Sequence, residues 1–380
     1  MSTRRAFRPS PDLVLEDRVV LSRASGLAAV AAIRAAAIRV HPATPQATEA
    51  PTLSLRSIQQ ASRALGTVAT LGDSYTDEYN TYPGGRSQAR SWVQFLAVNR
   101  GIQFGSYSQV SRGESRYQGY GLNYARSNAT TDDLLAYQLP QLVRKMSHGG
   151  IDNVVILAGG NDYLLPLKSL QQGKLTPTEF VNLLPQITAR AALNVETAVS
   201  TILLTNPNAH VVVSTIDVAG LPLVQGAVRL NPSLGPLVQA LGSAVSQFNA
   251  AIVNLTSSYA PNVGLLDLAA SAQQVQSQIA AGQTELEIGG ATIRLTTVGD
   301  DFHNFFQADG VHPGLVAQGL LANQVIEVFN TQFGTALTPL SGTEIVKYAA
   351  ATQYPTQIHG WKPPRPPIPM VPPGQHFRVV

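Results

Sequence analysis

Residues 153–162 read NVVILAGGND, in which an asparagine and five apolar residues run into two glycines and two polar residues. A continuous apolar run of this length that stops at glycine is typical of a parallel strand buried on both faces. Three further runs have the same character: TVATL at 67–71, HVVVSTI at 210–216 and VGLLDL at 263–268. The four runs predict the strands of a parallel sheet.

Helical stretches separate these strands, so helices are expected to cover both faces of the sheet. We expect them at 91–99, 180–204 (partly broken by Pro185), 234–259 and 314–329. A further short strand is expected at 104–110, and a β-hairpin at 285–297 that turns at Gly289-Gly290. The sequence therefore predicts an α/β fold: a five-stranded parallel sheet between two helical layers, plus a small hairpin insertion.

The composition fits a folded chain and excludes several kinds of site. The 380 residues are 44% hydrophobic and 13% charged, which leaves ample material for a core. There is no cysteine. A disulfide scaffold, a thiolate nucleophile, a Cys-ligated zinc site and an iron–sulfur cluster are therefore excluded.

The surplus of positive over negative charge lies at the two ends of the chain. The net charge is +3, and the sequence pI is about 9.1. The balance is +4 for residues 1–40 and +3 for 351–380, which leaves −4 for residues 41–350. A body without a surplus of positive charge is poorly suited to binding phosphates, so nucleic acid is not an expected partner.

The ends also differ from the middle in composition, which divides the chain into three parts. Residues 1–56 are expected to be a largely disordered leader and linker, 57–345 the folded domain, and 346–380 a proline-rich tail with eight prolines between Pro355 and Pro373. The tail is a solvated spacer or a contact for a partner or the cell surface. No apolar run reaches the roughly 18 residues of a membrane span.

Residues 13–22, LVLEDRVVLS, resemble the short Leu-Glu-x-Arg…Leu-Ser signature near the N-terminus of many planctomycete-type exported or surface proteins. The resemblance implies a secreted or cell-surface bacterial protein.

Three loops carry residues suited to chemistry at the carboxyl edge of the sheet. Ser74 follows the first strand in Gly-Asp-Ser, where the backbone N–H groups of a turn can stabilise an oxyanion. Asn161 follows the strand at 153–158 and can donate over the same edge. Asp309 and His312 lie three residues apart across a turn. His312 could be a general base for Ser74, with Asp309 orienting the imidazole ring.

These loops resemble the blocks of the SGNH, or GDSL-type, lipase and esterase family over residues 66–330. The family fold is a flavodoxin-like α/β/α sandwich with a five-stranded parallel sheet. The resemblance implies that Ser74, His312 and Asp309 are catalytic, and that the Ser74 N–H group and the Asn161 side chain are oxyanion donors. It implies no cofactor and no metal.

One block departs from the family pattern. Asn128, in the segment 123–130, stands where the family has glycine. The family uses the backbone N–H group of that residue, which asparagine also has, and asparagine tolerates left-handed backbone angles. Asn128 is therefore expected to complete the oxyanion hole.

Several other residues have competing interpretations. His303 could approach the site or be a surface histidine, and Asp73 is expected to fix the Ser74 loop rather than act as an acid. The pairs Asp132–Asp133 and Asp300–Asp301 could bind Ca²⁺, but solvated loop carboxylates are the more frequent case.

Two leucine-rich stretches, 163–167 and 221–224, follow expected strand ends. They either line an acyl pocket or form a lid, or they pack in the core. As a pocket they would favour medium acyl chains over acetate.

The leading interpretation is a serine esterase or lipase. Two alternatives stay open: a carbohydrate O-acetyl esterase acting on polysaccharide, and an idle hydrolase fold that serves as a surface binding module. The expected partner is accordingly a small-molecule or polysaccharide ester.

Overall fold

The computed structural model describes residue 60 and residues 65–78, 90–107 and 119–351. Every described residue lies within the unit formed by residues 51–380. The expected leader, the 13–22 signature, the linker at 41–56 and the tail from residue 352 onward lie outside the described residues.

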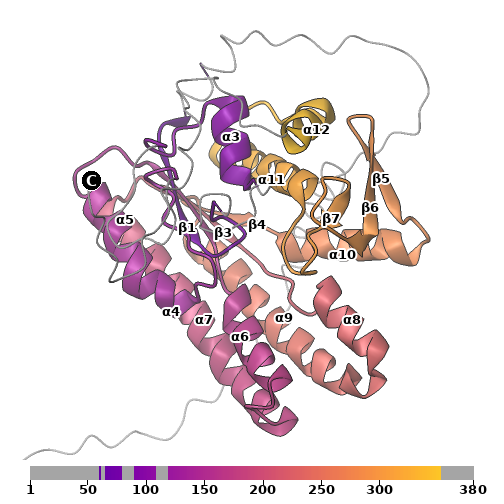
Figure 1. Ribbon diagram of the computed structural model, residues 1–380. Coiled ribbons are helices and arrows are strands. Elements are labelled where there is room, and N and C mark those ends of the chain that lie inside the picture. Colours follow the sequence, from indigo (N-terminus) through magenta and orange to yellow (C-terminus); the bar gives the residue numbers. More distant parts are fainter. Residues whose placement is uncertain (1–59, 61–64, 79–89, 108–118, 352–380) are drawn as a thin grey trace, which may run out of the picture. The chain divides into compact units, whose positions relative to one another are not determined.

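A parallel sheet in the order β1-β2-β3-β4 is the frame of the fold (Figure 1). Its strands are Val68–Gly72, Asn153–Leu157, His210–Ser214 and Val263–Leu266. The register pairs Gly72 with Leu157, so the carboxyl ends of the first two strands meet at one level. Almost every strand residue is buried, which agrees with the continuous apolar runs in the sequence.

Alternate residues of each strand belong to two separate hydrophobic clusters, one on each face of the sheet. In β2, Val154 and Ile156 join the cluster on one face, which also contains residues of helices between 139 and 258. Val155 and Leu157 join the cluster on the other face, which contains residues of the helices at 92–100, 268–280, 315–333 and 342–350. The sheet is thus covered on both sides, and the predicted three-layer α/β/α class is confirmed.

The helical elements are, in chain order, α3 (Trp92–Arg100), α4 (Thr131–Asp133), the π-helical η2 (Leu134–Gln138), α5 (Leu139–Met146), α6 (Gly160–Gln171), α7 (Pro177–Thr205), α8 (Pro222–Leu230), the 3₁₀ turn η3 (Pro232–Leu234), α9 (Gly235–Ser258), α10 (Leu268–Ala280), α11 (Leu315–Phe333) and α12 (Gly342–Ala350). The four expected helices correspond to α3, α7, α9 and α11. The described fold continues past residue 345 because α12 buries Tyr348 and Ala349.

The predicted strand count of five is wrong for the described residues, where the sheet has four strands. At the edge of the sheet beside β1, where the fifth strand was expected, the backbone forms two isolated bridges. They join Gln103 to Thr67 and Asn123 to Thr70. Phe104 is only 1% exposed, so the apolar character of the segment that begins at 104 reflects burial in the core rather than a strand ladder. Residues 108–110 of the expected strand lie outside the described part of the chain.

The expected break at Pro185 is absent, and α7 runs through it as one 29-residue helix. Pro185 is exposed, so water can bond the carbonyl group that the missing N–H group leaves free. Among the described residues, α7 is the helix long and apolar enough for a membrane span, with mean hydropathy 1.2 in its most apolar window. Its buried face packs in the core with α9 and the sheet, as expected of a core helix.

The predicted hairpin is confirmed as β5 (Glu285–Ile288) and β6 (Ala291–Val298). A third strand, β7 (Asn304–Phe306), pairs parallel to β6 and was not expected. Because β7 leads directly into the loop at 307–313, this small sheet holds one side of the candidate site.

Candidate active site

The structure brings the three sequence-predicted loops together at the carboxyl edge of the sheet. Ser74 lies two residues beyond β1, and Asn161 lies in the first turn of α6, just beyond β2. Asp309 and His312 lie on the loop between β7 and α11.

A sharp turn at Gly72 directs the chain toward Ser74. Gly72 has φ 144°, and a Cβ atom there would lie 2.1 Å from the carbonyl oxygen of Leu157. Only glycine permits this approach. The next residue, Asp73, donates its N–H group to the same oxygen at 3.1 Å, and its carbonyl group accepts from Thr76 and Asp77. The Ser74 side chain is thereby held on a closed turn and is 8% exposed.

A chain of contacts joins Ser74, His312 and Asp309. The Nε2 atom of His312 lies 2.9 Å from the Oγ atom of Ser74. The Nδ1 atom of His312 is in short contact with a carboxylate oxygen of Asp309. The other carboxylate oxygen accepts the backbone N–H groups of Val311 (3.0 Å) and His312 (3.1 Å). Such a chain can move a proton from a hydroxyl group to an imidazole whose ring is fixed by a carboxylate.

The Asp309 carboxyl is built to stay ionised. Burial on its own would raise its pKa, but the His312 ring and the two backbone N–H groups stabilise the carboxylate more strongly. The net effect holds the pKa of Asp309 well below its ordinary value. A carboxylate that stays charged favours a proton on the facing nitrogen of His312, and in that tautomer Nε2 accepts from the Ser74 hydroxyl group.

Two further contacts brace the His312 loop. Gly310 takes φ 65° and donates to the Gln307 carbonyl group at 2.9 Å, which closes the turn. The hydroxyl group of Tyr75 donates to the Val311 carbonyl oxygen at 2.7 Å. Since Tyr75 follows Ser74 directly, this bond ties the serine turn to the histidine loop.

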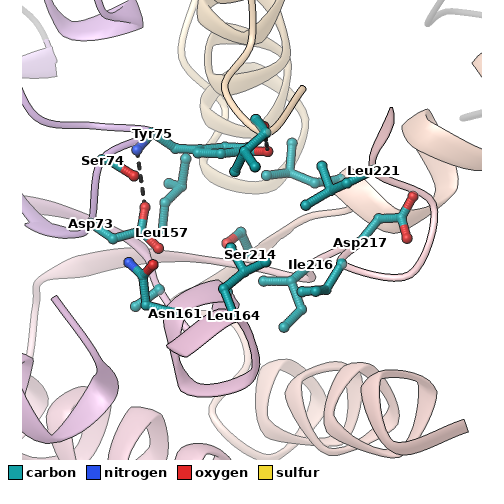
Figure 2. A pocket seen from close by; sticks show the side chains of 15 residues that line it. Asp73, Ser74, Tyr75, Leu157, Asn161, Leu164, Ser214, Ile216, Asp217 and Leu221 are labelled. Carbon is teal, nitrogen blue, oxygen red and sulfur yellow. Dashed lines mark hydrogen bonds between the residues drawn. The ribbon is translucent and has the colours of Figure 1, made fainter. Parts of the chain in front are cut away.

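The loops that carry Ser74, Asn128 and Asn161 hold donors that are not fully used within the described residues. Within the described residues, neither the N–H group of Ser74 nor that of Asn128 donates to a protein acceptor. The Asn161 amide donates one hydrogen to the Ala129 carbonyl oxygen at 3.0 Å, which orients the side chain and leaves its second hydrogen available. Asn161 is 8% exposed and lines the same pocket as Ser74 (Figure 2).

Asn128 adopts the left-handed backbone that its position requires. It has φ 66° and is the non-glycine residue with positive φ among the described residues. Its side chain is exposed and does not line the pocket. Asp77 holds the preceding residue, because its carboxylate accepts both the N–H group (2.6 Å) and the hydroxyl group (2.9 Å) of Ser127.

Asp73, the residue before Ser74, has a buried carboxyl group with a raised pKa. Burial raises its pKa to about 7, partly opposed by a hydrogen bond from the Tyr75 N–H group at 3.0 Å. The carboxyl fixes the serine turn through that bond, as the sequence suggested.

An apolar pocket opens from Ser74 between the ends of β2 and β3 (Figure 2). Its volume is about 40 Å³. Of the two leucine-rich stretches, only Leu164 and Leu221 line it. Tyr163, Leu167 and Val224 are buried in the core instead. Each stretch therefore contributes one leucine to the wall of the pocket, while other residues of the same stretch pack in the core.

The remaining candidates lie in other surroundings. The His303 side chain is 44% exposed, is paired with Asp301 and does not line the pocket. Asp132 bonds Arg190 and Asn194, and Asp301 bonds Arg294. Asp133 accepts from the N–H group of Thr130, the N-cap residue of α4, and Asp300 accepts from the Ala308 N–H group. No group of three or more His, Asp or Glu side chains in the described part of the chain is arranged to hold a metal ion.

Gln138, the last residue of η2, is part of the site although no sequence pattern singles it out. Its buried carboxamide accepts from the Gly72 N–H group and donates to the Gly72 carbonyl oxygen, both at 2.8 Å. A lone glutamine in an ordinary helical stretch gives no signal for such a contact across 66 positions.

The chain is similar to a known protein family and to several solved structures. The family model described as GDSL-like lipase/acylhydrolase matches residues 68–325. None of the curated proteins matches the chain significantly. Among solved structures, the chain is similar to the lipase Lip_vut3 from a goat rumen metagenome, at 16% identity and TM-score 0.42, over 69% of this chain and 96% of that one. It is also similar to phospholipase A1 from Streptomyces albidoflavus NA297, at 16% identity and TM-score 0.38, over 70% and 99%.

A third similar structure is the family 3 carbohydrate esterase of Clostridium thermocellum, at 16% identity and TM-score 0.34, over 70% of this chain and 94% of that one. The family match spans more than half of the chain and includes the serine turn, the Asn161 turn and the Asp309–His312 loop. The chain therefore belongs to the GDSL-like lipase/acylhydrolase family and is an ester-bond hydrolase.

Proposed function

We propose that this hydrolase is a serine esterase in which Ser74 is the nucleophile, His312 the general base and Asp309 the group that orients His312. The observation that carries the proposal is the continuous chain of contacts from Ser74 Oγ through the two nitrogens of His312 to Asp309. A nucleophile, a base and an orienting carboxylate within hydrogen-bond reach of one another are the components that acyl transfer through a serine needs.

In the first half of the reaction, Ser74 Oγ attacks the ester carbonyl carbon as His312 Nε2 takes the hydroxyl proton. The carbon–oxygen bond to the alcohol then breaks, and His312 returns the proton to the departing alkoxide. In the second half, His312 takes a proton from water, the hydroxide attacks the acyl-serine, and Ser74 leaves with the proton from His312. Asp309 stays ionised and stabilises the imidazolium at each step.

The negative charge that forms on the carbonyl oxygen needs donors fixed in advance. We assign this role to the N–H groups of Ser74 and Asn128 and to the Asn161 side chain. Two observations support this assignment. The N–H groups of Ser74 and Asn128 have no protein acceptor among the described residues, and a hydrogen bond to the Ala129 carbonyl oxygen orients the Asn161 amide. The left-handed backbone at Asn128 supports its use in place of glycine.

The two alternatives from the sequence make different predictions. A carbohydrate O-acetyl esterase would use the same residues, so it differs only in the substrate. An idle binding module would have no use for a base within 2.9 Å of a serine hydroxyl group that also lines a pocket. The contacts therefore favour an enzyme over a module.

An active-site phosphonate tests the mechanism directly. The full chain would be treated with a p-nitrophenyl alkylphosphonate and digested, and the modified peptide would be sequenced by mass spectrometry. We expect one equivalent of p-nitrophenol per chain, with the phosphonyl group on Ser74 and loss of p-nitrophenyl butyrate hydrolysis. Ser243, an exposed serine on α9, gives the matched control variant: Ser243→Ala should label normally, whereas Ser74→Ala should not. Labelling elsewhere with full loss of activity would refute the assignment of Ser74.

For the location of the protein, we propose secretion or attachment at a bacterial cell surface, on the basis of residues 13–22. Expression with and without residues 1–56, followed by cell fractionation, tests this. Equal distribution of both forms would contradict it.

A further inference from the structure

We infer that the pocket beside Ser74 is an acyl site for short chains, so that the substrate is an ester of an acid of two to four carbons. This rests on the proposed function, because Ser74 must be the atom to which the acyl group is attached. The residues that set the limit are Leu164 on α6, Ile216 beyond β3 and Asp217 next to it.

The size of the pocket limits the acyl chain. A cavity must offer about 10–15 Å³ to hold one water molecule. A pocket of about 40 Å³ therefore holds about three or four groups of that size. An acetyl group has one carbon beyond its carbonyl and a butyryl group has three. An octanoyl group has seven, which is about twice what the pocket accommodates.

The walls of the pocket are largely apolar. Leu157, Leu164, Ile216 and Leu221 line the pocket, so an acyl chain that enters it exchanges water for apolar contacts. The free energy of transfer favours each added methylene only while the chain remains among these side chains.

The far end of the pocket carries a carboxyl group. Figure 2 shows Asp217 on the side opposite Ser74 and Asp73. Its carboxyl group accepts from the Gly220 N–H group at 2.9 Å and from Gln276 at 3.1 Å, so it is fixed in place. A longer hydrocarbon chain would strip water from this carboxyl without providing a hydrogen bond, which is unfavourable. The polar end thus opposes chains that outgrow the apolar walls.

The boundary at this end is also held rigidly. The Leu223 N–H group donates to the Gly310 carbonyl oxygen at 3.1 Å, which fastens the start of α8 to the loop that carries His312. Gln225 donates to the Ala219 carbonyl oxygen at 2.8 Å and closes the segment that contains Leu221. Widening of the pocket would break these contacts.

The test is a chain-length profile of the full chain on p-nitrophenyl acetate, butyrate, hexanoate and octanoate. We expect kcat/KM to be greatest for acetate or butyrate and at least tenfold lower for octanoate. Leu164→Ala should move the optimum toward hexanoate by enlarging the pocket, and Ile216→Ala is the second variant if the first folds poorly. Leu165→Ala is the matched control, since Leu165 is the next residue on α6, is 38% exposed and does not line the pocket.

The outcomes separate the two proposals. Serine-dependent turnover that is greatest on octanoate, or a profile that neither pocket variant moves, would overturn the short-chain inference and leave the esterase mechanism standing. Absence of Ser74-dependent turnover on every ester, acetylated xylan included, would overturn both.

A separate observation supports a second inference: the geometry points to Gln138 as a positioning residue for the serine turn. Its carboxamide pairs with both backbone groups of Gly72, two residues before Ser74, and is 2% exposed. Arg126, from the loop that contains Asn128, donates its N–H group to the same Gly72 carbonyl oxygen at 3.1 Å. Gln138 and Arg126 therefore fix the Ser74 and Asn128 loops on one shared atom.

The π-helical η2 is the feature that makes this contact. It lies between α4 and α5 and ends at Gln138. A π-turn adds a residue relative to an α-helix, is rare in proteins and is frequently found at functional sites. Here the shifted backbone accompanies an inward-facing glutamine at the point where β1 ends.

Gln138→Glu tests this role through its pH dependence. An ionised carboxylate accepts from the Gly72 N–H group but repels the Gly72 carbonyl oxygen, whereas a protonated carboxyl satisfies both. We expect kcat of the variant at pH 8 to fall at least tenfold with KM little changed, and the ratio of variant to wild-type kcat to recover as the pH is lowered toward 6. Gln138→Leu should lose kcat without this recovery, and Gln141→Glu on the next helix is the matched control.

Circular dichroism at each pH value shows whether the variants stay folded. A defect that follows the folded fraction, or a kcat ratio that does not change with pH, would overturn the positioning role.

Discussion

The Nε2 atom of His312 lies 2.9 Å from the Oγ atom of Ser74, although 238 positions separate the two residues in the chain. Ser74 is placed by the end of β1 and the turn at Gly72, and His312 by a loop between β7 and α11. Their contact is therefore a product of the whole sheet and of the small insertion that ends in β7.

Replacing Ser74 with alanine should abolish turnover while leaving the fold intact. The substitution removes the nucleophile, and loss of such a group costs about 10⁴-fold or more in kcat. Among the described residues, the side chain forms a hydrogen bond to His312, so its loss should leave the melting temperature within about 1–2 °C of wild type. Steady-state hydrolysis of p-nitrophenyl butyrate and a thermal melt measure the two quantities. Turnover near the wild-type rate would contradict the assignment.

Asp309→Asn should lower kcat by about 10²–10⁴-fold, because asparagine cannot stabilise the imidazolium and permits the wrong tautomer. The stability should also respond to pH. The folded-state pKa of Asp309 lies below the ordinary 3.8, so its contribution to stability is present above pH 3.8 and is lost as the pH falls below it. The wild type should therefore lose more stability than the variant between pH 5 and pH 3. Urea unfolding at both pH values checks this, and equal losses would contradict it.

Asp73→Asn should have the opposite pH dependence. Burial raises the folded-state pKa of Asp73 from 3.8 to about 7. The stabilisation that goes with the protonated form is complete below pH 3.8 and is lost as the pH rises through about 7. Asparagine can still accept from the Tyr75 N–H group and carries no charge, so the variant should gain stability relative to wild type between pH 6 and pH 8. Melting temperatures across this range measure the gain, and a constant difference would refute it.

Asn161→Ala should reduce kcat by about 10²–10³-fold with little change in KM, because an oxyanion donor acts mainly in the transition state. The control is Asn254→Ala, which changes an exposed asparagine on α9. A rise in KM at constant kcat would show that Asn161 binds the ground state instead.

Substitutions at Asn128 should separate the backbone conformation from the side chain. Glycine adopts φ 66° without strain, so Asn128→Gly should retain kcat within about threefold. Asn128→Ala should lower stability by about 1 kcal/mol, because alanine lacks the local hydrogen bonds that let asparagine take left-handed angles. Urea unfolding and kcat of both variants provide the comparison. A large loss of kcat in the glycine variant would show that the side chain itself takes part.

The sequence by itself determined the features that depend on residues close together in the chain, such as the Gly72–Ser74 turn. Buried parallel strands need apolar residues on both faces, so β1 to β4 were visible as apolar runs. The hairpin was visible through alternation and a pair of glycines. Ser74, Asn161, Asp309 and His312 could be selected because each follows a strand end or a turn.

The tertiary structure decided what depends on long-range packing. The segment at 104 had the composition of a strand, but its backbone pairs with β1 only at single positions because neighbouring parts of the chain compete for the same edge. Pro185 does not break α7, since its side of the helix faces water. The Gln138 contact with Gly72 and the size of the pocket beside Ser74 have no sequence signal, because each depends on distances between groups from elements far apart in the chain. Local patterns therefore specified the elements and the reactive groups, whereas packing set the geometry between them.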